Sequence, residues 1–458
     1  MNVSNRTISI AGYIFAFIVL ISILCVWQPS PPDDFLRHIR HAEYAPHGGY
    51  AYMFPYSYFE TFTWDPWYGF DRLAGFLKTW VGSNRTVLLY QVVFVLLFCV
   101  GMVLNLRSRA DHFLLHLMFL FVLLSLVINR LVLIRPCILM AVIFFLAIPG
   151  KRFWSGFLAC LVGALFYYLF FLYTVPLAIA HYFKGSRKFS YGLALGTLLS
   201  LAGWMILTNF GLLSILAHTV RALLSSRNGL VVVENTLSID QIERVPVYLI
   251  VFFFLLTFHR CRTLDIYAVL LLATAPLALQ ARYFADLTLP LMVIYTLNNN
   301  EEMYGFLSRN KPVFEAFALV SILLVVPGIQ NVSLRSPYTT RLDGLDLPMG
   351  ARVFAADGFP TNFSAVFWNR TPIKVIPSSE IGWNDTETLG LIKEITRDRT
   401  IPARFCDYAL RHRIDYVLSE SPSLAACLTH VKSFSKGKRV DLFKSTFSNP
   451  RLDMYESG

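Results

Sequence analysis

Charged side chains are scarce in this chain. Of its 458 residues only 15% are Asp, Glu, Lys or Arg, whereas 55% are hydrophobic. The mean hydropathy is +0.54, and soluble domains usually carry about 25% charged residues. The composition therefore excludes an ordinary soluble domain and predicts an integral membrane protein.

Several motifs are also missing. The sequence contains no Gly-rich phosphate loop, no nucleophile elbow and no CxxC or zinc-type spacing. Five of the seven cysteines lie in or beside apolar runs, and only Cys406 and Cys427 lie in the less hydrophobic tail. These two either form a disulfide in an oxidising compartment or are free core residues.

Apolar runs recur along the first three quarters of the chain. A bilayer core of about 30 Å needs roughly 20 apolar residues per helix, and the pattern predicts about eleven spans. These are 8–27, 87–106, 112–128, 131–149, 153–168, 169–183, 191–208, 246–258, 264–280, 284–297 and 312–329. Pro176 interrupts one of them, so the stretch 153–183 is either two spans or a re-entrant hairpin.

The basic residues give the spans an orientation. With a cytoplasmic amino terminus, every short inside loop is basic, as the positive-inside rule requires. The net charge of +11 lies largely in these loops, so lipid head groups explain it better than nucleic acid does. Residues 28–86, 209–245 and 330–458 then lie outside.

The tail after residue 329 differs from the rest. Strand-like segments at 351–357, 372–378 and 415–420 alternate with helix-like segments at 387–398, 403–412 and 423–430. The predicted fold class is therefore mainly α: a polytopic membrane domain, residues 1–329, followed by a small extracytoplasmic α/β domain, residues 330–458.

A dense charge cluster, PPDDFLRHIRHAEY, follows the first apolar run. Asp33 and Asp34 are adjacent, and Arg37, His38 and His41 follow one and two helical turns later on a similar face. One acid would be enough to favour a helix start. The pair together with the bases indicates a site, and the alternative is a solvated charged helix.

The second half of the same loop, YSYFETFTWDPWYGFDRLAGF, interleaves aromatic rings with charges. The candidates are Trp64, Asp65, Trp67, Tyr68, Asp71 and Arg72. Aromatic rings at a bilayer surface are often anchors, and rings beside carboxylates also suit sugar binding. A helix lying along the membrane surface fits both interpretations.

Two further stretches place ionisable residues at outer helix junctions. NRLVLIRPC contains Arg130 and Arg135, and LQARYFADLTLP contains Arg282, Tyr283 and Asp286. Charges at such positions are costly and indicate function. Converging Arg side chains could hold an anion such as a lipid phosphate; each could also be an Arg that reaches from a helix end toward water.

The order of these features resembles the GT-C superfamily of membrane glycosyltransferases. The resemblance rests on PPDDFLRHIR after the first span, on WDPWYGFDRL later in that loop and on ARYFADLTLP. The WWDYG-like motif of oligosaccharyltransferase catalytic subunits is missing. The better match is therefore with enzymes that transfer a single sugar, such as protein mannosyltransferases and aminoarabinose, arabinofuranosyl or pilin glycosyltransferases.

The resemblance implies an inverting hexosyl- or pentosyltransferase with a polyprenyl-phosphate-linked donor. The acceptor would be a protein such as a pilin, or an envelope glycan or lipid. Asp33 or Asp34 would be the general base. The donor phosphate would be bound by Arg37, His38, Arg135, Arg282 and Tyr283. The sugar or acceptor would be bound by Trp64, Asp65, Trp67, Tyr68, Asp71 and Arg72.

The same resemblance implies no nucleotide and no nucleic acid, because the sugar arrives activated on a membrane lipid. A divalent metal held by Asp33 and Asp34, as in some relatives, is left open, although adjacent acids alone are a weak ligand set.

The favoured location is a bacterial inner membrane, with the tail in the periplasm. The endoplasmic reticulum is the alternative, in which N-x-S/T triplets would be glycosylated; they begin at Asn84, Asn331, Asn362, Asn369 and Asn384. The rival functions are a transporter or flippase of a lipid-linked or anionic solute, and a scaffold subunit. A transporter is disfavoured because no internal repeat is visible and the charges lie at the outer interface.

Overall fold

The computed structural model describes most of the chain, in segments. They are residues 5–27, 35–57, 60, 65–106, 113–132, 134–213, 216–217, 241–278, 285–299, 309–310, 312, 342, 344–356, 359–377, 384–420, 425–434 and 439–447. Asp33, Asp34, Trp64, Arg282 and Tyr283, and most of the predicted span 312–329, lie outside these segments.

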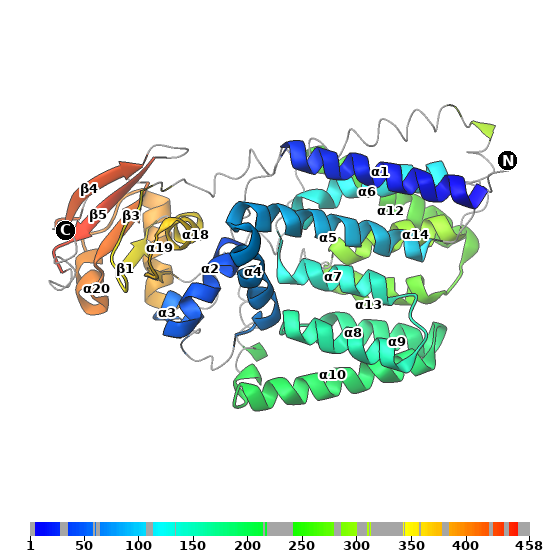
Figure 1. Cartoon of the computed structure of the whole chain (residues 1–458), viewed down its shortest axis with the longest axis horizontal. Coiled ribbons are helices and arrows are strands. Elements are labelled where there is room, and N and C mark those ends of the chain that lie inside the picture. Colours follow the sequence, from blue (N-terminus) through cyan, green and yellow to red (C-terminus); the bar gives the residue numbers. More distant parts are fainter. Residues whose placement is uncertain are drawn as a thin grey trace.

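The amino-terminal part is a bundle of helices that run roughly along one direction (Figure 1). Its helices are α1 (Asn5–Trp27), α5 (Ser83–Asn105), α6 (Phe113–Leu131), α7 (Pro136–Ala147), α8 (Phe153–Phe166), α9 (Phe171–Lys184), α10 (Arg187–Leu207), α12 (Gln241–Cys261), α13 (Ile266–Ala278) and α14 (Ala285–Asn299). Each of the first ten predicted spans overlaps one of them.

Local sequence explains where several of these helices begin. Pro136 occupies the first turn of α7, where its missing N–H costs nothing. The Ser186 hydroxyl accepts a hydrogen bond from the Phe189 N–H and caps α10. The stretch 153–183 forms two helices of 14 residues each, and a helix of that length rises only about 21 Å.

Length and composition single out two membrane-crossing candidates in the described part of the chain. They are Arg85–Asn105 in α5 and Arg187–Leu207 in α10. The remaining apolar helices are shorter by the same measure. Eleven spans therefore stay a prediction, whereas the mainly helical architecture with a small carboxyl-terminal sheet is what the structure shows.

The tail forms a five-stranded mixed sheet with the order β2-β1-β3-β5-β4. Its elements are β1 (Arg352–Ala355), α18 (Phe359–Trp368), β2 (Lys374–Ile376), α19 (Thr386–Asp398), α20 (Phe405–His412), β3 (Tyr416–Ser419), β4 (Leu428–Phe434) and β5 (Val440–Ser445). β1 pairs in parallel with β2 and β3, and β5 pairs antiparallel with β3 and β4.

The predicted α/β character of the tail matches these elements, but one segment was wrong. Residues 423–430 were predicted as a helix, whereas Leu428 begins edge strand β4. The middle of β4 is exposed on both faces, so it lacks the apolar alternation that identifies a strand. Strand β5 was not predicted because its buried run includes Asp441 and Lys444.

Cys406 and Cys427 form a disulfide between α20 and the turn before β4. The bond closes a loop with a sequence separation of 21 residues, which corresponds to about 3 kcal/mol of stabilisation in the chain-entropy description. We expect Cys406→Ser to make the tail markedly more sensitive to limited proteolysis at 37 °C, and reductant to have the same effect on the wild-type chain. Equal proteolysis rates with and without the bond would contradict this prediction.

Three of the asparagines in N-x-S/T triplets have structural roles. Asn362, Asn369 and Asn384 are buried, at 0%, 0% and 6% exposure. The Asn369 side chain accepts from the Leu347 N–H at 2.7 Å and donates to the Thr371 carbonyl at 2.8 Å. A glycan cannot be attached to such side chains in the folded protein.

Three short helices of the first loop lie between the bundle and the sheet (Figure 1). They are α2 (Phe35–Tyr44), α3 (Tyr50–Met53) and α4 (Tyr68–Val81), with a short 3-10 turn, Ala45–His47, between the first two. α4 runs across the ends of the bundle helices and joins α5 at Gly82. α2 packs closely on α4: a Cβ added at Gly75 would lie 2.7 Å from the Ala42 Cβ.

Candidate functional site

Helix α2 brings three basic side chains into a buried position. Arg37, His38 and His41 are exposed by only 1%, 0% and 6%. Phe35 and Ile39 of the same helix are fully buried in the apolar core, which fixes the rotation of α2. The charge cluster predicted from the sequence is therefore not a solvated helix face.

Helix α4 and the turn before it supply two carboxylates. Asp71 lies in the first turn of α4 and is 1% exposed. Asp65 lies in the preceding turn, where its Oδ1 accepts a hydrogen bond of 2.8 Å from the Trp67 N–H. The buried Asp65 Oδ2 has no hydrogen-bond partner among the described residues.

Asp71 is held by two side chains from different elements. Its Oδ1 makes a short hydrogen bond with Nδ1 of His38, and its Oδ2 accepts a 2.7 Å hydrogen bond from the Tyr50 hydroxyl. The Tyr50 oxygen also lies 3.1 Å from His38 Nδ1. The three groups form a closed polar triangle inside an aromatic shell that includes Phe70, whose ring lies 4.9 Å from that of His38.

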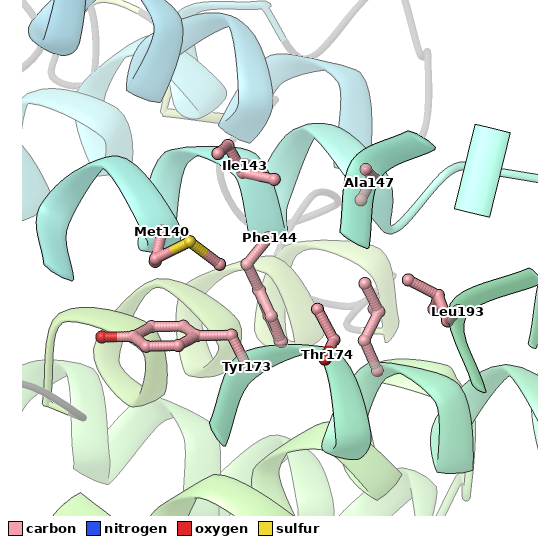
Figure 2. Close-up of a pocket in the computed structure, with 9 residues that line it drawn as sticks. Met140, Ile143, Phe144, Ala147, Tyr173, Thr174 and Leu193 are labelled. Carbon is pink, nitrogen blue, oxygen red and sulfur yellow. The ribbon is translucent and has the colours of Figure 1, made fainter. Parts of the chain in front are cut away.

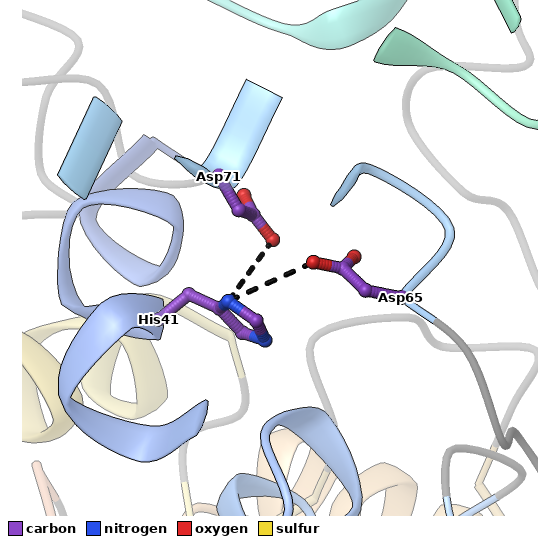
Figure 3. Close-up of side chains that lie close together, drawn as sticks. All are labelled: His41, Asp65 and Asp71. Carbon is purple, nitrogen blue, oxygen red and sulfur yellow. Dashed lines mark ion pairs between the residues drawn. The ribbon is translucent and has the colours of Figure 1, made fainter. Parts of the chain in front are cut away.

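His41 lies between the two carboxylates (Figure 3). Its Nδ1 is 3.6 Å from Asp65 Oδ2 and 3.6 Å from Asp71 Oδ2. The imidazole stacks on Tyr50 with ring centroids 4.4 Å apart. Gly49 approaches from the other side at positive φ, and a Cβ there would lie 3.0 Å from His41 Nε2, so the turn requires glycine.

Burial controls the charge of this cluster. It raises the pKa of Asp71 well above its usual value, and the neighbouring Asp65 raises it further, while the Tyr50 hydrogen bond and Arg37 oppose the shift. Burial, reinforced by Arg37, lowers the pKa of His38 well below its usual value. The cluster therefore favours a protonated Asp71 beside a neutral His38.

Cations surround the cluster. The Arg37 guanidinium lies 4.4 Å from the centroid of the Trp67 ring, a cation–π arrangement. Arg135 precedes α7 and is close enough to lower the pKa of His38. Arg72 is exposed and lies over Tyr68 at 5.3 Å, and it acts on His41 in the same direction.

The structure thus assembles Arg37, His38, Arg135, Asp65 and Asp71 from three separate stretches of sequence. Among the residues predicted to form a sugar platform, Trp67 and Asp71 are buried. Tyr68 is half-buried. The other predicted site residues, Asp33, Asp34, Trp64, Arg282 and Tyr283, lie outside the described segments.

Sequence reasoning missed the part played by Tyr50. It lies in GGYAYMF, which has no charge and no recognisable motif. The only local signal is the Gly-Gly pair, which indicates a tight turn. The carboxylate pair was also missed, because six residues separate Asp65 from Asp71 and only folding brings them together.

The described residues include one set with the donor chemistry of a metal site. One ligand atom from each of His41, Asp65 and Asp71 lies within 4.8 Å of the others. Two carboxylates and an imidazole suit Mn²⁺ or Zn²⁺, and the unbonded Asp65 Oδ2 is free to coordinate. The donor set therefore fits a divalent cation.

A small hollow between α7, α8, α9 and α10 has different chemistry (Figure 2). Its lining is apolar apart from Tyr173 and Thr174 and includes Met140, Phe144 and Leu193. It offers neither an acid nor a base to a substrate. The first-loop cluster is therefore the candidate site.

The architecture defines a class: a helical bundle, a polar site carried by short helices across one end of it, and a carboxyl-terminal sheet beyond the site. Among solved structures, the chain is similar to the arabinofuranosyltransferase AftD from Mycobacteria, determined by single-particle cryo-EM. The TM-score is 0.51 at 13% identity. The match covers 98% of this chain but only 42% of that one.

This likeness extends over nearly the whole chain and confirms the predicted GT-C fold. It is a likeness of fold, since the identity is low. No family of known sequences matches the chain, and no curated protein does.

Proposed function

We propose that this protein is an inverting glycosyltransferase. It moves a single sugar from a polyprenyl-phosphate-linked donor to an acceptor on the outer face of a bacterial inner membrane. The acceptor is a protein such as a pilin, or an envelope glycan or lipid. The observation that carries the proposal is the buried His–Asp–Arg cluster at the end of a helical bundle with a GT-C fold.

The position of the cluster suits a donor that is greasy at one end and charged at the other. α4 carries Asp71 and joins α5, one of the two helices long enough to cross a membrane. On the far side of α4, Phe76 and Trp80 are 57% and 75% exposed, as expected of rings at a bilayer surface. A lipid phosphate lies at this depth. The finer topology, eleven spans with a periplasmic tail, is part of the proposal.

The chemistry needs one base and one set of cations. A carboxylate, Asp33 or Asp34, takes the proton of the acceptor hydroxyl. The hydroxyl oxygen bonds to the anomeric carbon, and the bond from that carbon to the phosphate oxygen breaks with inversion. The lipid phosphate leaves with the electron pair, so charge grows on its oxygens in the transition state.

Arg37 and Arg135, together with Arg282 and Tyr283, stabilise that growing charge. A preorganised donor at such a position typically contributes roughly 3 to 4 kcal/mol. His38 is neutral and bonded to Asp71, so its role is to orient α2 and to donate a hydrogen bond rather than to carry charge. Arg72 and Tyr68 on the accessible side, with Trp64, contact the sugar or the acceptor.

Purified chain, reconstituted in liposomes, tests the proposal directly. We expect radiolabelled sugar to pass from synthetic polyprenyl-phosphate hexose or pentose donors to a mixture of envelope glycan acceptors and pilin-like peptides. Movement of the intact donor between leaflets without sugar transfer would instead establish the flippase. Mass spectrometry of the product identifies the sugar and shows its anomeric configuration.

The proposal extends to a divalent cation held by His41, Asp65 and Asp71. Such an ion must displace the proton that burial holds on Asp71, since metal ligands bind in their deprotonated form. We therefore expect Mn²⁺ affinity to rise with pH, roughly tenfold per pH unit while one proton is displaced. A titration followed by electron paramagnetic resonance at pH 6 and pH 8 measures this.

Asp65→Asn should weaken Mn²⁺ binding, whereas Asp398→Asn, at an exposed ion pair with Arg397, should not. Affinity that does not change with pH, or that survives Asp65→Asn, would show that the cation binds elsewhere.

A further inference from the structure

Helix α2 has a second set of contacts, on the side away from α4. It lies between α4 and the sheet part, with α18 packed against it (Figure 1). The Tyr44 hydroxyl at its carboxyl end accepts a hydrogen bond of 3.1 Å from the Ile373 N–H, just before β2. Both residues are fully buried.

Charged groups connect the same three layers. Arg40 donates to the Arg370 carbonyl at 3.3 Å and pairs with Glu43 at 2.7 Å. Glu43 in turn pairs with Lys78 of α4. A continuous chain of polar contacts therefore runs from the loop before β2, through α2, to the helix that carries Asp71.

The α3 segment repeats this arrangement. Tyr50 faces the candidate site, whereas Tyr52 lies under Lys374 of β2, whose Nζ is 4.7 Å from the ring centroid. Three residues beyond α3, the Tyr56 hydroxyl donates to the His412 carbonyl at 3.3 Å. Both elements that supply site side chains from this half of the loop are therefore held from behind by the tail.

We propose that Tyr44 is a positioning residue through which the α/β tail sets the place of α2, and thereby of His38 and His41 relative to Asp65 and Asp71. One turn of helix separates Tyr44 from His41, so a displacement of one moves the other. The tail is then a structural partner of the site rather than an appendage. The catalytic consequence rests on the proposed transferase function, but the structural coupling does not.

Tyr44→Phe removes the hydroxyl and leaves the ring that fills the site. Losing one neutral hydrogen bond is expected to speed hydrogen exchange of the α2 amides about fivefold. Tyr267→Phe is the matched control, because its hydroxyl donates to the Asn105 carbonyl at 3.0 Å, at the far end of α5. It should leave exchange in α2 unchanged. Arg40→Gln, a second variant on the same face, should raise exchange in α2 about twofold.

In sugar transfer, Tyr44→Phe should lower kcat about tenfold and leave KM within about twofold, because misplaced groups cost more in the transition state than in binding. Exchange in α2 equal to that of wild type in both Tyr44→Phe and Arg40→Gln would overturn the proposal. Faster exchange with kcat unchanged would overturn the positioning role as well. A chain that transfers no sugar at all would defeat the proposed function while the exchange measurement still decided the coupling.

Discussion

Asp71→Ala is expected to destabilise the protein strongly, while Asp71→Asn is expected to be well tolerated. Alanine leaves the His38 Nδ1 and the Tyr50 hydroxyl without their carboxyl partner. Each buried polar group left unsatisfied costs about 1–3 kcal/mol, so the loss is about 2–6 kcal/mol. Asparagine has the shape of a protonated aspartate, and it can accept from Tyr50 and donate to a neutral His38.

Apparent unfolding temperatures of the two variants in detergent measure this difference. If Asp71 were ionised in the folded protein, asparagine would replace a charged partner and would destabilise nearly as much as alanine. That result would reverse the protonation states assigned to the cluster. Tyr50→Phe, which removes one of the two partners, should fall between wild type and Asp71→Ala.

The protonation states also predict a pH dependence. Because the pKa of Asp71 is raised on folding, the folded state binds more protons, and stability falls as pH rises from the unfolded pKa toward the folded one. Asp71→Asn lacks this group. The unfolding temperature of Asp71→Asn relative to wild type should therefore rise between pH 5 and pH 8. The lowered pKa of His38 acts in the opposite direction, with stability lost as pH falls below about 6.5, and it is common to both proteins.

The helical part could be predicted well from the sequence because its signal is local. Apolar runs such as 87–106 and 284–297 need no knowledge of their neighbours, and each matches a helix, α5 and α14. The number of helices that cross a membrane depends on length, tilt and lipid contact, which composition alone does not determine.

The candidate site shows the opposite behaviour. Arg37, His38 and His41 could be found because they crowd one short helix, but their partners come from elsewhere in the loop. That Asp71 would face His38 depends on the packing of Ala42 against Gly75, and no spacing in the sequence indicates it. The aromatic residues were predicted to bind sugar, and Trp67 instead covers Arg37 and His38.

The tail illustrates a third limit. β5 carries Asp441 and Lys444 inside a buried strand, so hydrophobicity hides it. The Asp441 charge is balanced by Arg439, whose Nε lies 3.2 Å from it. Such pairs form only after the strands associate.

The second large effect concerns the identity of the base. If Asp33 or Asp34 takes the acceptor proton, Asp33→Asn or Asp34→Asn should lower kcat by about 10²–10⁴, with normal membrane insertion and an unchanged unfolding temperature. Asp398→Asn, an exposed carboxylate on α19, is the control and should transfer sugar at the wild-type rate.

Asp65 is the rival that the structure itself supplies. One of its oxygens is fixed by the Trp67 N–H, and the other lacks a hydrogen bond among the described residues, as a base that awaits a substrate proton would. Asp71 is a poor rival, because a carboxyl held protonated cannot accept a proton. Full transfer in both Asp33→Asn and Asp34→Asn, with loss in Asp65→Asn, would move the base to the turn before α4. The reaction would then take place against His41, where the pH dependence of kcat should follow the lowered pKa of that imidazole rather than a carboxyl in the loop before α2.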